Sequence, residues 1–229
     1  MQESFDFAGA EIVRWRAGLG RRFGSLGSVP RRRPIGQFVK SLISSRTRDA
    51  VSLAAYRRLG RRWTNVADLA CAPPTAIERA IADVTFAEKK AVHLPAALRL
   101  IGSERPDFSL DFLGAMPVPD ALAWLERCPG VGRKVAAATL NASTLRRPVF
   151  IVDSHVHRVL QRLGFVGEKA SARAASELVT ASASPLGADD LFELFAQMKR
   201  LGQTICRFEE PACSICPLAH CCRTASKLP

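Results

Sequence analysis

The sequence of 229 residues lacks any long hydrophobic run. No uninterrupted apolar stretch approaches the roughly 20 residues that a membrane-spanning helix needs. The first residues, MQESFDFAGAEIVRWRAG, are acidic before they are basic, which is not the order found in a secretory signal peptide. We therefore expect no membrane partner and a cytoplasmic location, where disulfide bonds are rare.

Acidic residues are also in short supply. Lysine and arginine together number 33, against 21 aspartate and glutamate residues, so the formal net charge is +12. A positive excess of this size favours a polyanionic partner such as nucleic acid. A basic protein without such a partner is the alternative that charge alone leaves open.

Patterns typical of β-strands are scarce, and helical patterns fill the chain. The apolar segment VFIV at residues 149–152 has no evident partner strand, so we interpret it as a buried loop. Residues 72–84 are predicted to form a helix with Thr75 as its N-cap, and residues 86–101 a helix that contains Pro95. Further helices are predicted over residues 7–23, 35–45, 47–63, 119–128, 135–143, 153–165 and 189–206. The sequence therefore predicts an all-α fold.

A tight turn lies between two of these helices, in the segment LERCPGVGRKVAAATLN at residues 125–141. Helix, turn and helix together form a helix-hairpin-helix, in which Gly130 and Gly132 are expected to adopt backbone angles that side chains forbid. The amides of such a turn and of the following helix N-terminus bind anions, including DNA phosphates. The candidate DNA contacts are Pro129, Gly130, Val131, Gly132 and Arg133. A plain helix–helix turn is the alternative.

Lys134 follows in the first turn of the second helix. The helix dipole disfavours positive charge there, and Arg133 acts in the same direction, so both are expected to lower the pKa of Lys134. A lysine that is a neutral amine at working pH is a nucleophile able to form a Schiff base. The alternative is a solvated lysine or one that contacts a phosphate.

Asp153 stands between apolar residues and a helix, in the segment FIVDSHVHRV. Aspartate is a favoured N-cap, which gives Asp153 a purely structural interpretation. An aspartate held beside apolar residues also stabilises a cation or accepts a proton, so it is a catalytic candidate as well. His155 follows and is expected to orient this segment and to belong to the DNA-binding surface.

Five of the seven cysteines lie beyond residue 205. In a reducing compartment such clustering indicates a metal site. The candidate ligands Cys206, Cys213, Cys216 and Cys222 follow the order Cys-x6-Cys-x2-Cys-x5-Cys. Four thiolates so close in sequence bind zinc or an iron–sulfur cluster. Cys221 competes with Cys222 for the fourth place, and only the spacing favours Cys222.

The hairpin with Lys134, the segment VDSHVHRV around Asp153 and the spaced cysteines together resemble endonuclease III. That family belongs to the helix-hairpin-helix (HhH-GPD) superfamily of base-excision DNA glycosylases. The resemblance implies two helical domains with a DNA-binding cleft between them. A six-helix barrel that carries the hairpin would span 27–147. The segments 1–26 and 148–229 would form a domain in which the four cysteines hold a [4Fe–4S] cluster.

The resemblance also implies an enzyme that acts on double-stranded DNA. The damaged base is flipped out of the duplex, and Lys134 attacks C1′ of its sugar. A Schiff base then leads to β-elimination, which nicks the strand, while Asp153 activates the lysine and stabilises positive charge on the sugar. The expected substrates are oxidised pyrimidines, such as thymine glycol, and abasic sites. We expect a monomer, associated with the nucleoid if the source is bacterial.

Some features depart from the family pattern. Arg46 stands where endonuclease III carries the glutamine that fills the space left by the flipped base. Arg46 remains a candidate DNA contact, but it opens the possibility of a shifted base specificity. Glu209 and Glu210 make acidic a loop that is commonly basic in the family. A non-catalytic, damage-sensing DNA-binding protein and a zinc-stabilised nucleic-acid binder are two further functions that the sequence leaves open.

Overall fold

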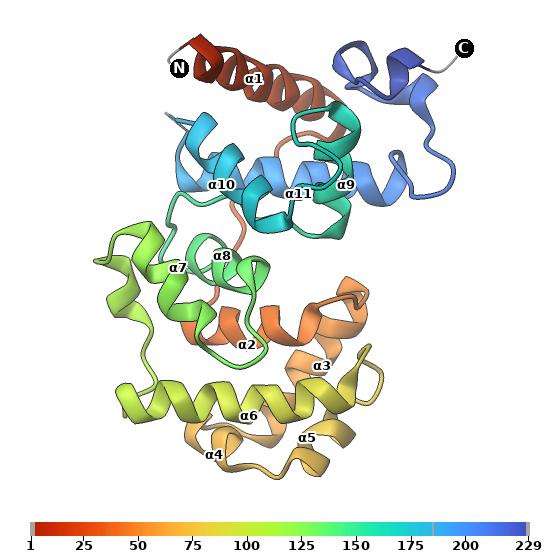
Figure 1. The fold of residues 1–229 in the computed structure, drawn as a ribbon. Coiled ribbons are helices and arrows are strands. Elements are labelled where there is room, and N and C mark those ends of the chain that lie inside the picture. Colours follow the sequence, from red (N-terminus) through yellow and green to blue (C-terminus); the bar gives the residue numbers. More distant parts are fainter. Residues whose placement is uncertain (1–2, 185, 228–229) are drawn as a thin grey trace. The chain divides into compact units, whose positions relative to one another are not determined.

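A computed structural model describes residues 3–184 and 186–227 of the chain, with side chains over 8–184 and 186–226. The regular elements in these ranges are helical, and no β-strand occurs in them (Figure 1). The predicted all-α fold is therefore confirmed. The segment 149–152 is buried without forming a strand, as expected. None of the described helices is long and apolar enough to cross a membrane.

The chain divides into two compact units, Arg31–Leu145 and Met1–Pro30 with Arg146–Pro229. The first unit holds α2 (Pro34–Ser44), α3 (Asp49–Arg62), α4 (Val66–Cys71), α5 (Pro74–Ala80), α6 (Ala87–Glu104), the 3-10 turn η1 (Asp111–Gly114), α7 (Val118–Glu126) and α8 (Arg133–Asn141). The second holds α1 (Glu3–Phe23), α9 (Ser154–Leu163), α10 (Ala172–Ser182), α11 (Ala188–Thr204) and the 3-10 turns η2 (Cys213–Ile215), η3 (Ala219–Cys221) and η4 (Ala225–Lys227). The assignment of residues 27–147 to a six-helix barrel, and of residues 1–26 and 148–229 to a domain that holds a cluster, stays a prediction.

The helix predicted over residues 72–84 was wrong in its start and its extent. The N-cap is Pro73 and not Thr75, because Pro74 occupies the first turn, where its missing N–H costs no hydrogen bond. Helix α4 was not predicted; it begins after Asn65, whose side chain accepts a hydrogen bond of 2.8 Å from the Ala67 amide. Helix α10 was not predicted either, although Ser171 caps it by accepting from the amide of Ala174 at 3.1 Å.

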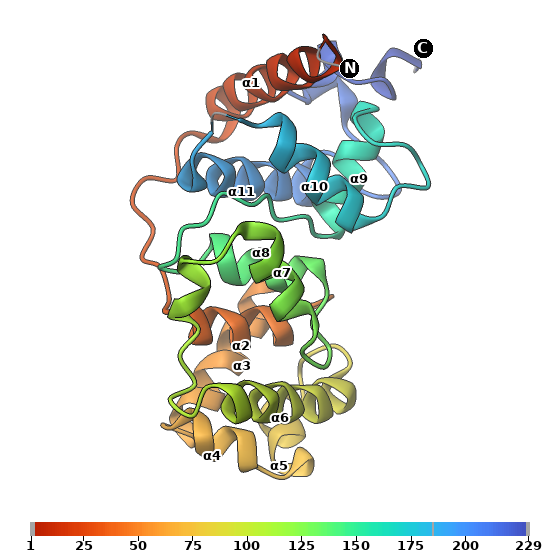
Figure 2. The same ribbon diagram turned by 60° about the vertical axis from the view of Figure 1, so that its left-hand side comes forward.

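The long helix α6 organises the Arg31–Leu145 unit. Figures 1 and 2 show it between α2 on one side and α4 with α5 on the other, and it packs against all three. Its buried face consists of small and branched apolar residues at helical spacing: Ala91, Leu94, Ala97, Leu98 and Ile101. On the other side α2 contacts α8, so α6, α2 and α8 form a continuous packed series that supports the hairpin.

In the second unit α11 is the element against which α1 and α9 pack. The core around these helices contains Trp15, Phe150 and Met198, all almost fully buried. The Trp15 ring meets Phe165 edge to face, with ring centroids 4.8 Å apart. This core supports the first residues of α9, where Asp153 lies.

We predict that Leu98→Ala destabilises the protein by about 2–5 kcal/mol, because it removes a fully buried side chain from the central helix and leaves a cavity. Chemical denaturation followed by circular dichroism measures the change. Val92→Ala is the matched control, since Val92 lies on the same helix and is 54% exposed, and it should cost about 0.5 kcal/mol or less. Equal losses in the two variants would contradict the assigned core.

Candidate active site

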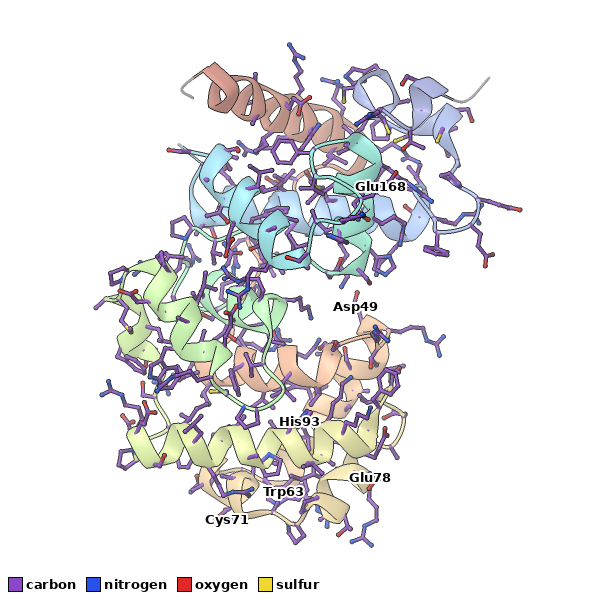
Figure 3. The ribbon with its side chains drawn as sticks, viewed as in Figure 1. Asp49, Trp63, Cys71, Glu78, His93 and Glu168 are labelled. Carbon is purple, nitrogen blue, oxygen red and sulfur yellow. The ribbon has the colours of Figure 1, made fainter. Side chains whose placement is uncertain are left out.

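The hairpin between α7 and α8 is a tight turn held close to α6. Gly130 has a φ of +75°, and a Cβ at this residue would lie 2.7 Å from the Cβ and Nδ1 atoms of His93. Figure 3 shows His93 on α6. Non-bonded atoms do not approach so closely, so both the backbone angle and the contact with His93 require glycine here. Gly130 therefore adopts the glycine-specific conformation that the sequence predicts.

Gly132 differs from this expectation. Its φ of −107° and ψ of −179° are extended angles that any residue adopts. No heavy atom lies within 4 Å of a Cβ built on it, so the protein itself does not require glycine at this residue. Gly132 leaves open space directly before α8, where the first amides of the helix have no partner within the helix.

An ion pair fixes the angle between the two helices of the hairpin. Arg133 Nε donates to Glu126 Oε1 at 2.7 Å, and both side chains are only 10% exposed. Loss of either partner of such a buried ion pair strongly destabilises a protein, because the other charge is left buried and unpaired. Arg133 therefore has a structural contact that was not expected from the sequence, and its predicted contact with DNA stays a prediction.

Lys134 lies in the first turn of α8, as the sequence predicted, and it is partly buried. No acidic residue occupies that turn, so the positive end of the helix dipole is not compensated by a carboxylate within it. A second lysine lies within electrostatic range, since the charge of Lys134 is one of the causes that lower the pKa of Lys90. This neighbour was not expected from the sequence.

Lys90 is a buried lysine on α6 with 7% of its surface exposed. Its Nζ donates to the carbonyl oxygens of Ile43 at 2.9 Å and Ser45 at 2.6 Å, and to the Thr47 hydroxyl at 3.3 Å. Burial, and then repulsion from Lys134, lower its pKa to about 8, while Glu88 acts in the opposite direction. No sequence signal identifies Lys90, because its acceptors lie at the end of α2 and in the loop that follows it, more than 40 residues earlier in the chain.

The loop anchored by Lys90 carries Arg46. Arg46 has a φ of 55° and Phe86 a φ of 58°, a region that side chains rarely occupy. The Arg46 guanidinium lies 5.8 Å from the centre of the Phe86 ring, and Phe86 is 45% exposed. The Thr85 amide donates to Thr47 Oγ1 at 3.1 Å, which ties the two loops together. Phe86 was not among the predicted site residues, because the pairing of an arginine with an exposed aromatic residue needs the fold.

Asp153 is the N-cap of α9. Its Oδ1 accepts hydrogen bonds of 2.9 Å from the amides of both His155 and Val156. The structural interpretation of Asp153 is thus correct, but it uses a single carboxylate oxygen. Oδ2 receives no hydrogen bond from any residue that the structure describes, so the cap leaves it available for chemistry.

His155 faces the interior of its own unit. A Cβ on Gly202 of α11 would lie 2.9 Å from the His155 Cβ, so the two helices touch at this glycine. Arg158, one turn further along α9, donates to the carbonyl oxygens of Gly202 at 2.6 Å and Cys206 at 2.9 Å. The orienting role expected for His155 and its contact with DNA both stay predictions.

The four candidate cysteine ligands influence one another. Burial and then the charges of Cys222 and Cys206 raise the pKa of the Cys213 thiol. The pKa of Cys216 is also raised, chiefly by burial, with smaller effects from Cys206, Cys222 and Cys213. Within the described ranges, no three His, Cys, Asp or Glu side chains lie close enough to hold a single metal ion. Four cysteine thiolates are the ligand set that an iron–sulfur cluster takes, so the chemistry of these four residues is that of such a donor set.

The structure also separates Cys222 from Cys221. Cys222 influences both Cys213 and Cys216, and its thiol donates to the carbonyl oxygen of Arg162 at 3.2 Å. The Cys221 thiol donates instead to Leu218 O at 3.4 Å, and its pKa is raised by burial and by the charges of Cys222 and of Glu11 on α1. The surroundings of Cys222 therefore favour it over Cys221 as the fourth ligand.

Arg162 at the end of α9 joins the cysteine-rich tail to the helix that Asp153 begins. Its guanidinium donates to Cys206 Sγ at 3.4 Å and to the carbonyl oxygens of Arg207 at 2.5 Å and Phe208 at 2.7 Å. A fixed cation beside thiolates offsets their mutual repulsion. Arg162 was not among the predicted site residues, because its partners lie more than 40 residues later in the chain.

Comparison with known proteins places the chain in a family. Residues 39–184 match the HhH-GPD superfamily base excision DNA repair protein family. The protein belongs to this superfamily. The resemblance inferred from the hairpin, the aspartate segment and the cysteines is confirmed. Both Lys134 and Asp153 lie inside the matched range, whereas the four cysteines lie beyond it.

Individual members of the superfamily are similar over most of the chain. Endonuclease III of Thermotoga maritima is 29% identical over 189 residues, which cover 82% of this chain and 82% of that protein. Endonuclease III homolog 2 of Arabidopsis thaliana is 27% identical over 202 residues. The aligned part covers 86% of this chain but only 50% of that longer protein. The structure of a trapped endonuclease III–DNA covalent intermediate matches with a TM-score of 0.78 at 22% identity, over 96% of this chain and 97% of that one. The fold is thus that of endonuclease III.

We predict that Gly130→Ala destabilises this HhH-GPD protein by about 1–3 kcal/mol, because it adds both a strained φ and a clash with His93. Gly132→Ala is the matched control, since its angles suit alanine and its surroundings are open, and it should change the free energy of unfolding by about 0.5 kcal/mol or less. Thermal and urea unfolding measure both. A tolerated Gly130→Ala would show that the turn does not need the left-handed residue.

Proposed function

We propose that the protein is a DNA glycosylase and abasic-site lyase of base excision repair. Its substrates are oxidised pyrimidines, such as thymine glycol, and abasic sites in double-stranded DNA. The observation that carries this proposal is Lys134 in the first turn of α8, directly after a glycine hairpin, in a chain of the HhH-GPD superfamily. The endonuclease III names of its relatives, and the covalent intermediate in the similar DNA complex, support it.

The hairpin offers a phosphate site before α8. The first amides of a helix carry partial positive charge and bind anions. The place where a Cβ of Gly132 would lie is open, so a DNA backbone can come close there without meeting a side chain. The net charge of +12 attracts DNA over a longer range. In the same unit, Arg46 and Phe86 form an exposed pair of the kind that inserts between unstacked bases.

The first chemical step breaks the bond between the base and the sugar. The neutral amine of Lys134 attacks C1′, the C1′–N bond breaks, and its electron pair leaves with the base, which takes up a proton. Asp153 acts through the oxygen that the cap does not use. Its carboxylate stabilises positive charge on the sugar and accepts the proton that the attacking amine loses.

The second step breaks the strand. Opening of the sugar ring gives a Schiff base between Lys134 and C1′, which withdraws electrons and makes the C2′ proton acidic. Removal of that proton forms a C2′–C3′ double bond, and the 3′ phosphate leaves with the electron pair of its C–O bond. Water then hydrolyses the Schiff base and releases Lys134. On a plain abasic site the lysine begins at the sugar aldehyde, so the lyase step proceeds without base release.

We further propose that Cys206, Cys213, Cys216 and Cys222 hold a [4Fe–4S] cluster. Such a cluster supplies structural cross-linking of the tail rather than chemistry at the sugar. Arg162 connects it to α9, because the same residue contacts Cys206 Sγ and, through its carbonyl oxygen, the Cys222 thiol. The cluster is thereby attached to the helix that begins at Asp153.

Lys134→Ala should abolish strand nicking and covalent trapping by borohydride on a duplex with an abasic site, and on one with thymine glycol. The variant should still bind both duplexes, because the hairpin is unchanged. Asp153→Asn keeps Oδ1 and hence the cap of α9, so its melting temperature should stay near that of the wild type while the nicking rate falls by roughly 100-fold or more.

Full nicking by Lys134→Ala would exclude it as the nucleophile. Trapping on the abasic duplex alone would retain Lys134 as the nucleophile but exclude thymine glycol as the substrate. The enzyme would then remove a different base, a possibility that Arg46 opens. No trapping by the wild type on either duplex would favour a non-catalytic, damage-sensing protein.

Cys222→Ser should lower the iron content and bleach the visible absorbance of the purified protein. Cys221→Ser is the matched control and should keep both, because the Cys221 thiol donates to Leu218 O and the cysteine spacing favours Cys222 as the ligand. Iron and sulfide analysis with a visible spectrum measures this. A colourless wild-type protein that contains zinc would show that the four cysteines form a zinc site instead of an iron–sulfur cluster. Bleaching by Cys221→Ser but not by Cys222→Ser would show that Cys221 is the fourth ligand.

A further inference from the structure

His93 is an exposed residue of α6 whose side chain lies against the hairpin turn. A Cβ on Gly130 would lie 2.7 Å from the His93 Nδ1 atom and 2.8 Å from its Cγ atom, so the imidazole ring is in contact with this glycine. Figure 3 shows His93 on the side of α6 that faces the hairpin. No hydrogen bond or ion pair joins His93 to any residue that the structure describes. Packing therefore holds the ring in place, while its N–H group stays available as a donor.

The turn that His93 contacts has available donors of its own. The Val131 amide donates to the carbonyl oxygen of Cys128 at 3.1 Å, which closes the turn. The amides of Gly130 and Gly132 donate to no residue within the described ranges. The place where a Cβ of Gly132 would lie is open. Donors from two elements, α6 and the hairpin, thus meet at one turn, and the described part of the chain supplies no acceptor for them.

The charges around this turn favour an anion. Residues four apart share a helix face, and Lys89 precedes His93 by four residues on α6. The turn itself, residues 129–132, contains no carboxylate. Glu126 before the turn is already paired with Arg133 and is only 10% exposed. An anion at the turn therefore meets donors and positive charge, and the carboxylate that is nearest in sequence already has a partner.

We propose that His93 is a further DNA contact: its imidazole donates a hydrogen bond to a phosphate of the strand that the hairpin amides hold. This contact rests on the proposed function of the hairpin as a phosphate site. Phosphate contacts fix the register of a protein on a duplex without reading its sequence. The hairpin also determines where α8 and Lys134 begin. A strand that is fixed by His93 and the hairpin amides is thereby placed relative to Lys134.

The test is a double-mutant cycle between His93 and single phosphates of a duplex. The duplex carries a tetrahydrofuran analogue of an abasic site, which forms no Schiff base, so binding is measured without strand nicking. In a set of such duplexes, one phosphate at a time is replaced by an uncharged methylphosphonate. His93→Leu keeps the bulk of the side chain but has no donor, so it should weaken binding to the unmodified duplex roughly fivefold to tenfold. On the duplex whose methylphosphonate replaces the contacted phosphate, it should weaken binding by about twofold or less.

His93→Gln retains an N–H donor and should keep most of the affinity for the unmodified duplex. Val92→Ala is the matched control, since it changes the neighbouring, exposed residue of α6 and should bind every duplex as the wild type does. If thermal unfolding shows that His93→Leu is unfolded, His93→Ala takes its place in the cycle.

An equal loss of affinity on every duplex, or no loss at all, would overturn the proposal and leave His93 only its packing against Gly130. Wild-type protein that binds none of the duplexes would instead remove the proposed function of the hairpin, and this contact with it.

Discussion

The close contact between Gly130 and His93 is the constraint on which the candidate site depends. It fixes the hairpin against α6, and the hairpin in turn fixes where α8 begins and how its first turn is directed. A residue with a Cβ cannot take this place, because it would meet both an unfavourable φ and the histidine. The Arg133–Glu126 pair then sets the angle between α7 and α8. The surroundings of Lys134 follow from these contacts.

Several features of the Arg31–Leu145 unit oppose stability. Arg46 and Phe86 occupy left-handed backbone angles, Lys90 is buried with its charge, and Lys134 adds positive charge at a helix N-terminus. Such features concentrate at functional sites, where the surrounding structure holds them in place. Here they lie in adjoining elements: the α2–α3 loop, the N-terminal end of α6 and the N-terminal end of α8. The well-packed face of α6 supplies the compensating burial.

The second unit depends on arginines that connect distant parts of the chain. Arg158 and Arg162 on α9 donate to backbone carbonyl groups at the end of α11 and in the cysteine-rich tail. The helix that Asp153 caps is therefore attached to the segment that carries the cysteines. Loss of order in the tail would disturb α9, because the same side chains serve both. The order of the cysteine-rich tail therefore affects the helix whose first residues position Asp153.

The sequence by itself determined the helical class, the hairpin, the lysine in the first turn, the aspartate cap and the cysteine spacing, because each is a local pattern of a few residues. It failed where a local signal was ambiguous: prolines at 73 and 74 moved a helix start, and Gly132 was assigned a strained angle that it lacks. Only the tertiary structure brought Lys90 to its acceptors at the end of α2, Phe86 to Arg46 and Arg162 to Cys206. These contacts join residues that are far apart in the chain, and helix packing decides them, since no pattern along the chain records which helix faces meet.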